Sequence, residues 1–411
     1  MKKTIIITFI MLVLFNHFLS FLNYRGSSSP ELHKEILKYF TEADIVNGEN
    51  YSRAGFGISL VRGIIFAGMT FTSLSRRLES FCARLSKNNF FLTSVYFIAI
   101  IYFIITLISL PFSFYLSYLT EHKFGFSNMT IGLWFWTRTK SFLMGLLCIS
   151  IIGSSALLVI RKFKFYSVFI VPAGCLIIGL IMIILYPIVI LPIFYEIKAI
   201  DNPRIEKRII ELANKSRVSV DNIYVIKESD YSKHTNAFFV GFGSSKKIFL
   251  YDTLLQNNNE AELISILAHE IGHWKYNHNL KGVFLGFLLY LTEFMAIYYC
   301  VKTLKNESES SIGEMYSPSM IPFYLLIFII FSIIADPIEN FVSRKMEMSA
   351  DQYALEATGD PDAFISAEIR IAKDNRSRLN KNPLAALFRD SHPMTIDRIK
   401  IAEKYREKTK R

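Results

Sequence analysis

The stretch of sequence that decides the fold is His269-Glu270-Ile271-Gly272-His273. Residues four apart lie on one face of a helix, so His269 and His273 can present two imidazoles to a single metal ion. Glu270 lies between them, where it can act as general base on a water held by that metal. Chance also produces this spacing, in roughly one chain in a hundred of this length. In that case both histidines are ordinary surface or core residues.

The residues before the motif favour the metal site over chance. Asn259 and Glu262 are three residues apart, which is the spacing of a capping box at the start of a helix. An apolar stripe at helical spacing follows them. It consists of Leu263, Ile264, Ile266, Leu267 and Ile271. The motif therefore lies well inside a predicted helix.

A third metal ligand is expected from a later helix, predicted over Ala335–Ala357. Glu347 would complete a three-ligand set and leave a fourth position open, as a catalytic zinc site requires. Asp351, one turn further on, would accept the free N–H of a ligand histidine. The alternative is a solvated face on which both carboxylates pair with neighbouring basic residues. With the histidines present, the sequence predicts one Zn²⁺ per chain.

Composition places this site in a membrane protein. Of the 411 residues, 52% are apolar and only 20% are charged, a balance typical of membrane proteins. The net charge of +11 comes largely from residues that flank apolar stretches and from the tail Lys400–Arg411. We therefore expect the lipid bilayer as a partner and no nucleic acid.

About seven stretches are apolar for close to the 20 residues that a membrane-spanning helix needs. They are Thr4–Leu22, Phe56–Leu74, Phe91–Tyr118, Phe142–Ile160, Val168–Phe194, Val283–Val301 and Ile321–Ile334. The first resembles a signal peptide, but no small-residue cleavage site follows it cleanly, which favours an uncleaved span. Arg62 in the second either faces a polar interior or extends to the interface. Pro187 and Pro192 predict a kink or an early end in the fifth.

The polar interval after the fifth span is predicted to contain a small β-structure. Asn222–Lys227 favours a strand, and Asn236–Phe242 and Lys247–Tyr251 favour two more, joined by Gly243-Ser244-Ser245 as a hairpin. The edge of this hairpin can bind an extended peptide by strand addition. Alternatively, the hairpin only covers the helix that carries the histidines.

The predicted fold class is mainly α, a polytopic membrane protein with about seven transmembrane helices and a zincin-like catalytic domain. The expected regions are an N-terminal transmembrane region at 1–195 and a catalytic segment at 196–282. Two transmembrane helices at 283–335 and C-terminal catalytic helices at 336–411 follow them.

With these motifs, the chain resembles the integral-membrane zinc metalloendopeptidases of the CAAX prenyl protease type (type I). The resemblance rests on matching segments in the family's order over most of the chain. They are Asn236–Phe242 followed by Lys247–Leu255, Ala268–Trp274, Ser343–Asp351, and Ser391-His392-Pro393 with Arg398. Weaker matches lie at Phe124–Ser127 and Tyr186–Pro192.

The resemblance implies roles for three further residues. His392 would stabilise the oxyanion of the tetrahedral intermediate, with Arg398 supporting that region, and Asn236 would lie near the substrate backbone. For His392, a turn before the final helix is the alternative explanation. The spans would enclose a water-filled chamber with the catalytic site at one end.

The predicted function is therefore that of a membrane-embedded zinc endopeptidase acting on peptide or protein substrates, prenylated if the resemblance extends that far. One alternative is a membrane-protein quality-control metalloprotease of broader specificity. Another is a multi-span transporter or scaffold with a structural metal site. The expected location is the bacterial cell membrane, or the endoplasmic reticulum membrane if the source is eukaryotic.

Overall fold

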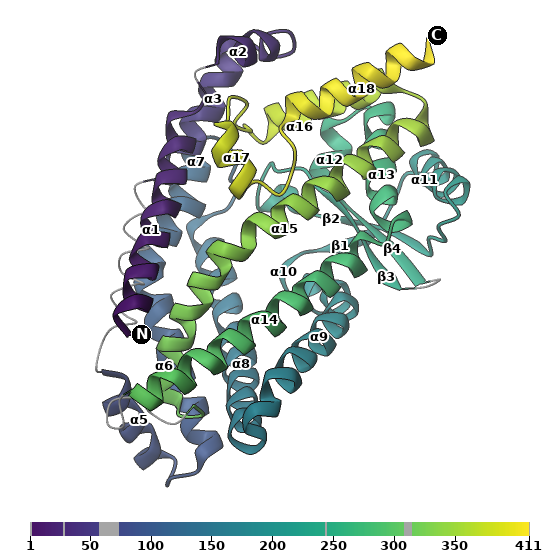
Figure 1. Ribbon diagram of the computed structural model, residues 1–411. Helices are drawn as coiled ribbons and strands as arrows, with labels where there is room; N and C mark the ends of the chain where they lie inside the picture. The colour runs from purple at the N-terminus through teal and green to yellow at the C-terminus, as the bar shows by residue number, and fades with distance from the viewer. Residues whose placement is uncertain (1, 28, 57–73, 243–244, 308–314, 411) are drawn as a thin grey trace.

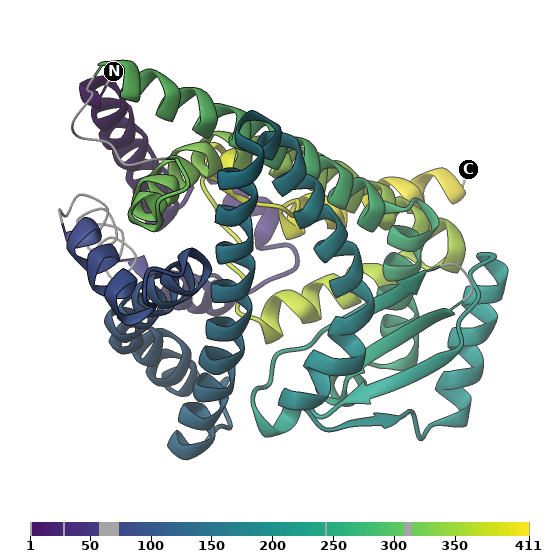
Figure 2. The same cartoon turned by 90° about the horizontal axis from the view of Figure 1, so that it is seen from below.

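The computed structural model describes residues 2–27, 29–56, 74–242, 245–307 and 315–410. Long helices extend over most of the molecule, and a small sheet with shorter helices lies at one side of one end (Figure 1). Seen from below, the sheet and the shorter helices around it lie at one side of the molecule, and long helices reach them from the other side (Figure 2).

The apolar part of the chain is built from long helices. They are α1 (Lys2–Arg25), α6 (Phe90–Phe114), α8 (Ile131–Phe163), α9 (Ser167–Leu185), α14 (His278–Glu307) and α15 (Ile321–Thr358). Four helical segments of the described chain are long and apolar enough to cross a membrane. These segments are Phe90–Lys123, Ile131–Phe194, His278–Thr303 and Pro318–Thr358. The second of them contains both α8 and α9, which are joined by the 3₁₀ turn η2 (Lys164–Tyr166).

These helices confirm the predicted mainly α fold with several membrane-capable helices. The first predicted span lies within α1, and the last two lie within α14 and α15. Residues 57–73 of the second predicted span, Arg62 included, lie outside the described residues. The count of about seven therefore stays a prediction.

Two of the long helices change their hydrogen-bonding pattern near their ends. Helix α6 continues into the π-helical turn η1 (Tyr115–Thr120) and the short helix α7 (Glu121–Lys123). Helix α9 continues into a second π-helical turn, η3 (Tyr186–Ile190), before α10 (Leu191–Phe194). Pro187 lies in η3, so the predicted disturbance occurs there as a π-turn, a usual cause of bending.

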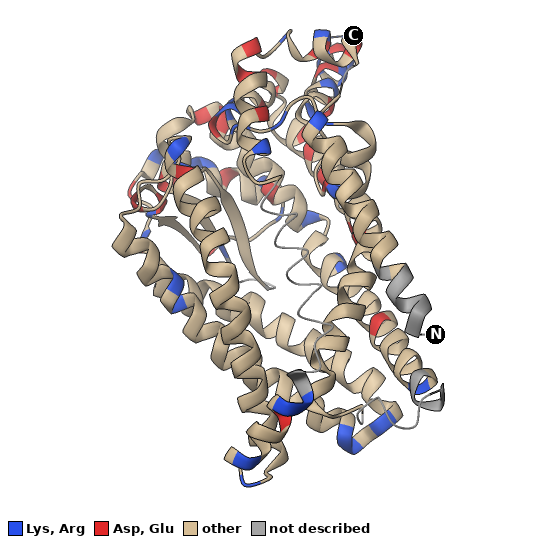
Figure 3. Cartoon of the chain, turned by 90° about the vertical axis from the view of Figure 1, so that its left-hand side faces the viewer, with Lys and Arg blue, Asp and Glu red and all other residues tan. Residues whose placement is uncertain are grey.

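Charged residues are distributed unevenly along the molecule. Lysine, arginine, aspartate and glutamate gather at the two ends, and the long helices between them are largely uncharged (Figure 3). A bilayer requires such an uncharged belt, because unpaired charges in its core cost several kcal/mol each.

The sheet has four strands in the order β1-β2-β4-β3. They are β1 (Ile197–Ala199), β2 (Asn222–Ile226), β3 (Ala237–Phe242) and β4 (Ser245–Tyr251). Strands β3 and β4 are antiparallel, which confirms the predicted hairpin pairing, although Gly243 and Ser244 of its turn lie outside the described residues. Strand β2 pairs with β4 in parallel and with β1 in antiparallel fashion. Strand β1 was not predicted, since three residues carry too little periodicity to mark a strand.

Shorter helices surround the sheet and the polar ends of the long helices. They are α2 (Pro30–Ile36), α3 (Glu42–Arg53), α5 (Leu74–Leu85), α11 (Pro203–Lys215), α12 (Asp252–Asn257), α16 (Pro361–Asp374), α17 (Pro383–Arg389) and α18 (Thr395–Thr409). Two further 3₁₀ turns are η4 (Glu228–Asp230) and η5 (Pro318–Met320).

Helix α13 (Glu260–Lys275) carries the histidine motif. Its first turn is closed by the predicted capping box: Asn259 Oδ1 accepts from the Glu262 amide at 2.9 Å, and Glu262 accepts from the Asn259 amide at 2.9 Å. Leu263, Leu267 and Ile271 are fully buried on the face towards the core. The predicted helix is therefore confirmed, with the motif in its last two turns.

Helix α15 is a single element of 38 residues that runs through Pro337 and across the predicted region boundary at 335. It crosses α13 closely at Gly272. A Cβ on Gly272 would lie 3.0 Å from the Ala350 Cα and 3.2 Å from the Ala350 carbonyl oxygen. Both of these atoms belong to the backbone and cannot move aside as a side chain can. Glycine is therefore what lets the two helices approach.

We expect Gly272→Ala to destabilise the fold by about 1–3 kcal/mol, because the added methyl meets the backbone of α15. The matched control is Gly286→Ala on α14, where an added Cβ meets nothing within 4 Å. Thermal unfolding in detergent measures both variants. Equal melting temperatures for Gly272→Ala and the wild type would show that the crossing is not tightly packed.

Candidate active site

The crossing of α13 and α15 brings three metal-ligating side chains together. His269 Nε2 lies 3.4 Å from one oxygen of Glu347, and His273 Nε2 lies 3.4 Å from the other. The two Nε2 atoms are 3.0 Å apart, and one ligand atom from each residue falls within 4.8 Å of the others. Residues four apart on one helix therefore meet a carboxylate that lies more than seventy positions away in sequence.

These three residues fit a single divalent cation. Their side chains are only 12%, 19% and 9% exposed for His269, His273 and Glu347, so the charge of Glu347 is poorly solvated. Two imidazoles and one carboxylate are the donors that a catalytic zinc site uses, with a fourth position left open. The site can hold a metal on this donor set.

Proton affinities also favour a cation between the histidines. Against the desolvation that lowers it, hydrogen bonds with Asp351 and Glu347 raise the pKa of His269 to about 10. Burial and the charge of His269 lower the pKa of His273 to about 4. The neighbouring carboxylates therefore stabilise positive charge at this position, and a bound cation would take the place of the proton on its ligand histidines.

Helix α15 also supplies the group behind His269. Asp351 is fully buried, and its Oδ1 lies 2.8 Å from His269 Nδ1, the position expected for a carboxylate that fixes the histidine tautomer. Arg398 on α18 binds the other oxygen of Asp351 through Nε at 2.8 Å. Its Nη1 binds Glu368 of α16 at 2.8 Å. Arg398 therefore lies behind His269 and holds Asp351 in place.

Two buried residues that contact this site were not predicted from the sequence. Glu368 is one of them, and burial raises its pKa to about 6 despite the opposing effect of Arg398. His278 is the other: its Nδ1 lies 3.0 Å from His273 Nδ1, and its Nε2 lies 3.2 Å from Ser349 Oγ. A histidine five residues beyond His273 was a visible signal, whereas Glu368 sits in an ordinary amphipathic helix.

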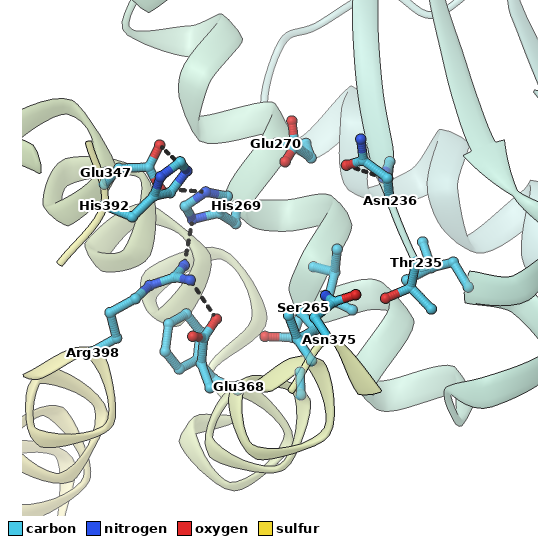
Figure 4. Close-up of a pocket in the computed structure, with 16 residues that line it drawn as sticks. Thr235, Asn236, Ser265, His269, Glu270, Glu347, Glu368, Asn375, His392 and Arg398 are labelled. Atoms are coloured by element: carbon cyan, nitrogen blue, oxygen red, sulfur yellow. Dashed lines mark hydrogen bonds and ion pairs between the residues drawn. The ribbon is translucent and has the colours of Figure 1, made fainter. Parts of the chain in front are cut away.

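A cavity of about 270 Å³ opens beside the ligand cluster. Glu270 lies on its wall opposite Glu347 and His392, and Asn236 and Thr235 lie further along the same wall (Figure 4). Burial raises the pKa of Glu270 to about 7. A carboxylate with that pKa can both accept and return a proton near neutrality, as a general base and acid must.

The remaining predicted site residues all line this cavity. His392 is 64% exposed, with Nε2 at 3.5 Å from Glu347 and Nδ1 at 2.9 Å from Ser391 Oγ. Asn236 directly precedes β3, and its Oδ1 accepts from the Ala237 amide at 2.9 Å. The structure thus brings together all eight predicted residues, and Arg398 pairs with Asp351 and Glu368.

Fold and site together define a multi-pass membrane metallopeptidase. The sequence profile of Peptidase family M48 matches residues 199–406, and that of the CAAX prenyl protease N-terminal region, described as five membrane helices, matches residues 20–196. The chain belongs to peptidase family M48, and it is a membrane metalloendopeptidase of the CAAX prenyl protease type.

Individual relatives agree with this assignment. CAAX prenyl protease 1 of Saccharomyces cerevisiae is 29% identical over 77% of this chain and 73% of its own length. An uncharacterized metalloprotease of Bacillus subtilis, YhfN, is 28% identical over 76% of this chain and 74% of its own. The crystal structure of S. mikatae Ste24p aligns with a TM-score of 0.85 over 97% of this chain and 98% of that one, at 24% identity. At that identity, the structural likeness shows a shared fold.

We expect Asp351→Asn to weaken metal binding by about 10- to 100-fold, because an amide supports His269 without the negative charge. Glu356→Gln, on an exposed position of the same helix, is the matched control. Competition with a chelator measures the affinity of each variant. Unchanged affinity in Asp351→Asn would mean that the carboxylate does not act through His269.

Proposed function

We propose that the metal is one Zn²⁺ per chain, held by His269 Nε2, His273 Nε2 and a Glu347 oxygen. The two imidazole donors, the carboxylate donor and the adjoining cavity support this choice, because a catalytic zinc site takes three protein ligands and leaves room for a water or substrate. Bound there, zinc would lower the pKa of a water to about 7 and polarise the scissile carbonyl. The single observation that carries the proposal is the cluster of these three donors beside the cavity that Glu270 lines.

In this proposal Glu270 takes the proton from the attacking water and later gives it to the leaving amine. His392 donates a hydrogen bond to the oxygen that becomes negative in the transition state. Donors of this kind are commonly worth about a hundredfold or more in rate. Asp351, supported by Arg398, keeps His269 in the tautomer whose Nε2 faces the metal.

We propose that the substrate peptide binds along β3 in an extended conformation. Strand β3 is at the edge of the sheet, and the cavity-lining Asn236 directly precedes it. An edge strand offers unpaired N–H and C=O groups, so strand addition binds any peptide backbone. Side-chain pockets would then decide which peptides are cleaved.

The substrate class we propose is proteins that end in a CAAX box, processed within the membrane. Support comes from the CAAX prenyl protease relatives, whose names describe this activity. In this arrangement, regions 1–195 and 283–335 form the membrane part, and regions 196–282 and 336–411 form the catalytic part. Broader proteolysis of membrane proteins is the competing function.

We expect Glu270→Gln to lose at least about a hundredfold in kcat while it keeps its metal, because an amide cannot accept the proton. The matched control is Glu260→Gln in the first turn of the same helix, whose ion pair with Arg204 is at the surface. Metal content and peptide cleavage are measured on the same preparations. Full activity in Glu270→Gln would assign the base elsewhere.

We expect an acid limb in the pH profile of kcat/KM that is set by Glu270. Only the ionised carboxylate accepts a proton, so the rate falls as the pH drops through its pKa. Burial places that pKa at about 7, and a neighbouring cation would move it back towards the ordinary value of 4.5. An acid limb between these values is therefore expected. A flat profile from about pH 4 to about pH 7 would contradict the role.

A farnesylated CAAX peptide and its unprenylated twin test the substrate class. We expect the purified wild type to prefer the prenylated peptide and to lose cleavage when a chelator is added. Equal cleavage of both peptides would support the broader protease. Cleavage that resists the chelator would contradict the metal-dependent reaction itself.

A further inference from the structure

The segment before β3 is joined to the membrane region by a dense set of hydrogen bonds. The Lys233 amide donates to the Phe126 carbonyl at 2.9 Å, and the Asn128 amide donates to the Tyr231 carbonyl at 3.1 Å. The Asn128 side chain donates to the Ser229 carbonyl at 2.8 Å. An isolated antiparallel bridge links Ser127 to Ser232. Residues 126–128, which connect α7 to α8, therefore fix the backbone of residues 229–233.

His234 continues this junction with its side chain. Its Nε2 lies 3.0 Å from an oxygen of Glu121, and its Nδ1 lies 3.0 Å from Asn375 Oδ1. Glu121 stands at the end of the α6–α7 segment, and its other oxygen accepts from the Tyr51 hydroxyl at 2.6 Å. The His234 ring stacks on Phe126, with 4.6 Å between ring centroids. One imidazole thus connects the membrane region to the end of α16.

Hydrogen bonds fix both the imidazole ring and the backbone of His234. An acceptor oxygen lies at each ring nitrogen, an arrangement in which a protonated ring can donate to both, and the hydrogen bond to Glu121 raises the pKa of His234. Charge-assisted bonds of this kind are shorter and stronger than neutral ones. The backbone is held as well, because the Thr253 hydroxyl donates to the His234 carbonyl at 2.7 Å.

The position of His234 gives the junction its significance. The next two residues, Thr235 and Asn236, line the cavity that contains Glu270, and so does Asn375. Strand β3 begins directly after them. A shift of His234 would therefore move the start of the edge strand relative to Glu270. Misplacement by about 1 Å can cost about a hundredfold in rate.

We propose that His234, held between Glu121 and Asn375, is a positioning residue that sets the substrate-binding edge of β3 relative to Glu270. This inference rests on the proposed peptidase function and extends it. The membrane region, through Glu121, determines how the peptide is presented to the catalytic residues. His234 itself touches neither the metal ligands nor the general base in this account.

The test compares His234→Phe with wild type on a long peptide that can lie along β3. Phenylalanine keeps a ring against Phe126 but makes neither hydrogen bond. We expect kcat/KM to fall by about 10- to 100-fold, with metal content and melting temperature unchanged. His234→Gln, whose amide can donate to Glu121, should recover part of the loss. His33→Phe is the matched control, because His33 forms an exposed pair with Glu42 at 2.8 Å on the surface.

A double-mutant cycle with Glu121→Gln tests the pairing itself. We expect the double variant to be no worse than the more damaged single variant, since each single variant already removes the charged pair between these two side chains. Independent, additive losses would overturn the inference, as would a His234→Phe loss matched by loss of metal or of thermal stability. Full activity in His234→Phe overturns this inference alone. Failure of wild type to cleave any peptide overturns the proposed function and this inference with it.

Discussion

The close approach of α13 and α15 at Gly272 is the contact on which the rest of the site depends. The two histidines reach Glu347 only because backbone packs against backbone at Ala350. Once that crossing is fixed, helical geometry places Asp351 one turn from Glu347, behind His269. A local requirement for a residue without a side chain thus sets the relative positions of the ligands and the carboxylate that orients one of them.

Because α15 is one continuous helix, it joins this site rigidly to the membrane region. The helix is unbroken from Ile321, in its apolar part, to Thr358. At about 1.5 Å per residue, Glu347 stands about 39 Å along it, which exceeds the roughly 30 Å thickness of a bilayer core. The ligand therefore lies beyond the length of helix that a bilayer core covers. The junction at His234 provides a second, separate attachment on the other side of the cavity.

Much of the site could be predicted because its signals are local. The spacing of His269 and His273, and the capping pair of Asn259 and Glu262, follow from one helical period and need no tertiary information. The structure places these residues as expected, although the catalytic roles themselves remain predictions. Strands β3 and β4 could also be predicted, because each is long enough for its side-chain pattern to show.

Other features of the fold and the site could not be predicted, because they depend on contacts between distant segments of the chain. The parallel pairing of β2 with β4 joins residues more than twenty positions apart through the backbone, which leaves no mark on side-chain pattern. Arg398 was expected to support the region of His392, and its pairing with buried carboxylates on α15 and α16 behind His269 could not be foreseen. Burial, which decides where a guanidinium is needed, is a property of the assembled fold and not of the segment around residue 398.

We propose that one zinc ion binds where α13 meets α15 and keeps a position free for the reaction. Anomalous X-ray scattering at the zinc absorption edge, from crystals of the zinc-loaded protein, tests it most directly. We predict a single peak about 2.0–2.2 Å from His269 Nε2, His273 Nε2 and a Glu347 oxygen, with the fourth position not taken by a side chain. A peak elsewhere in the chain, or a site closed by four protein ligands, would contradict the account.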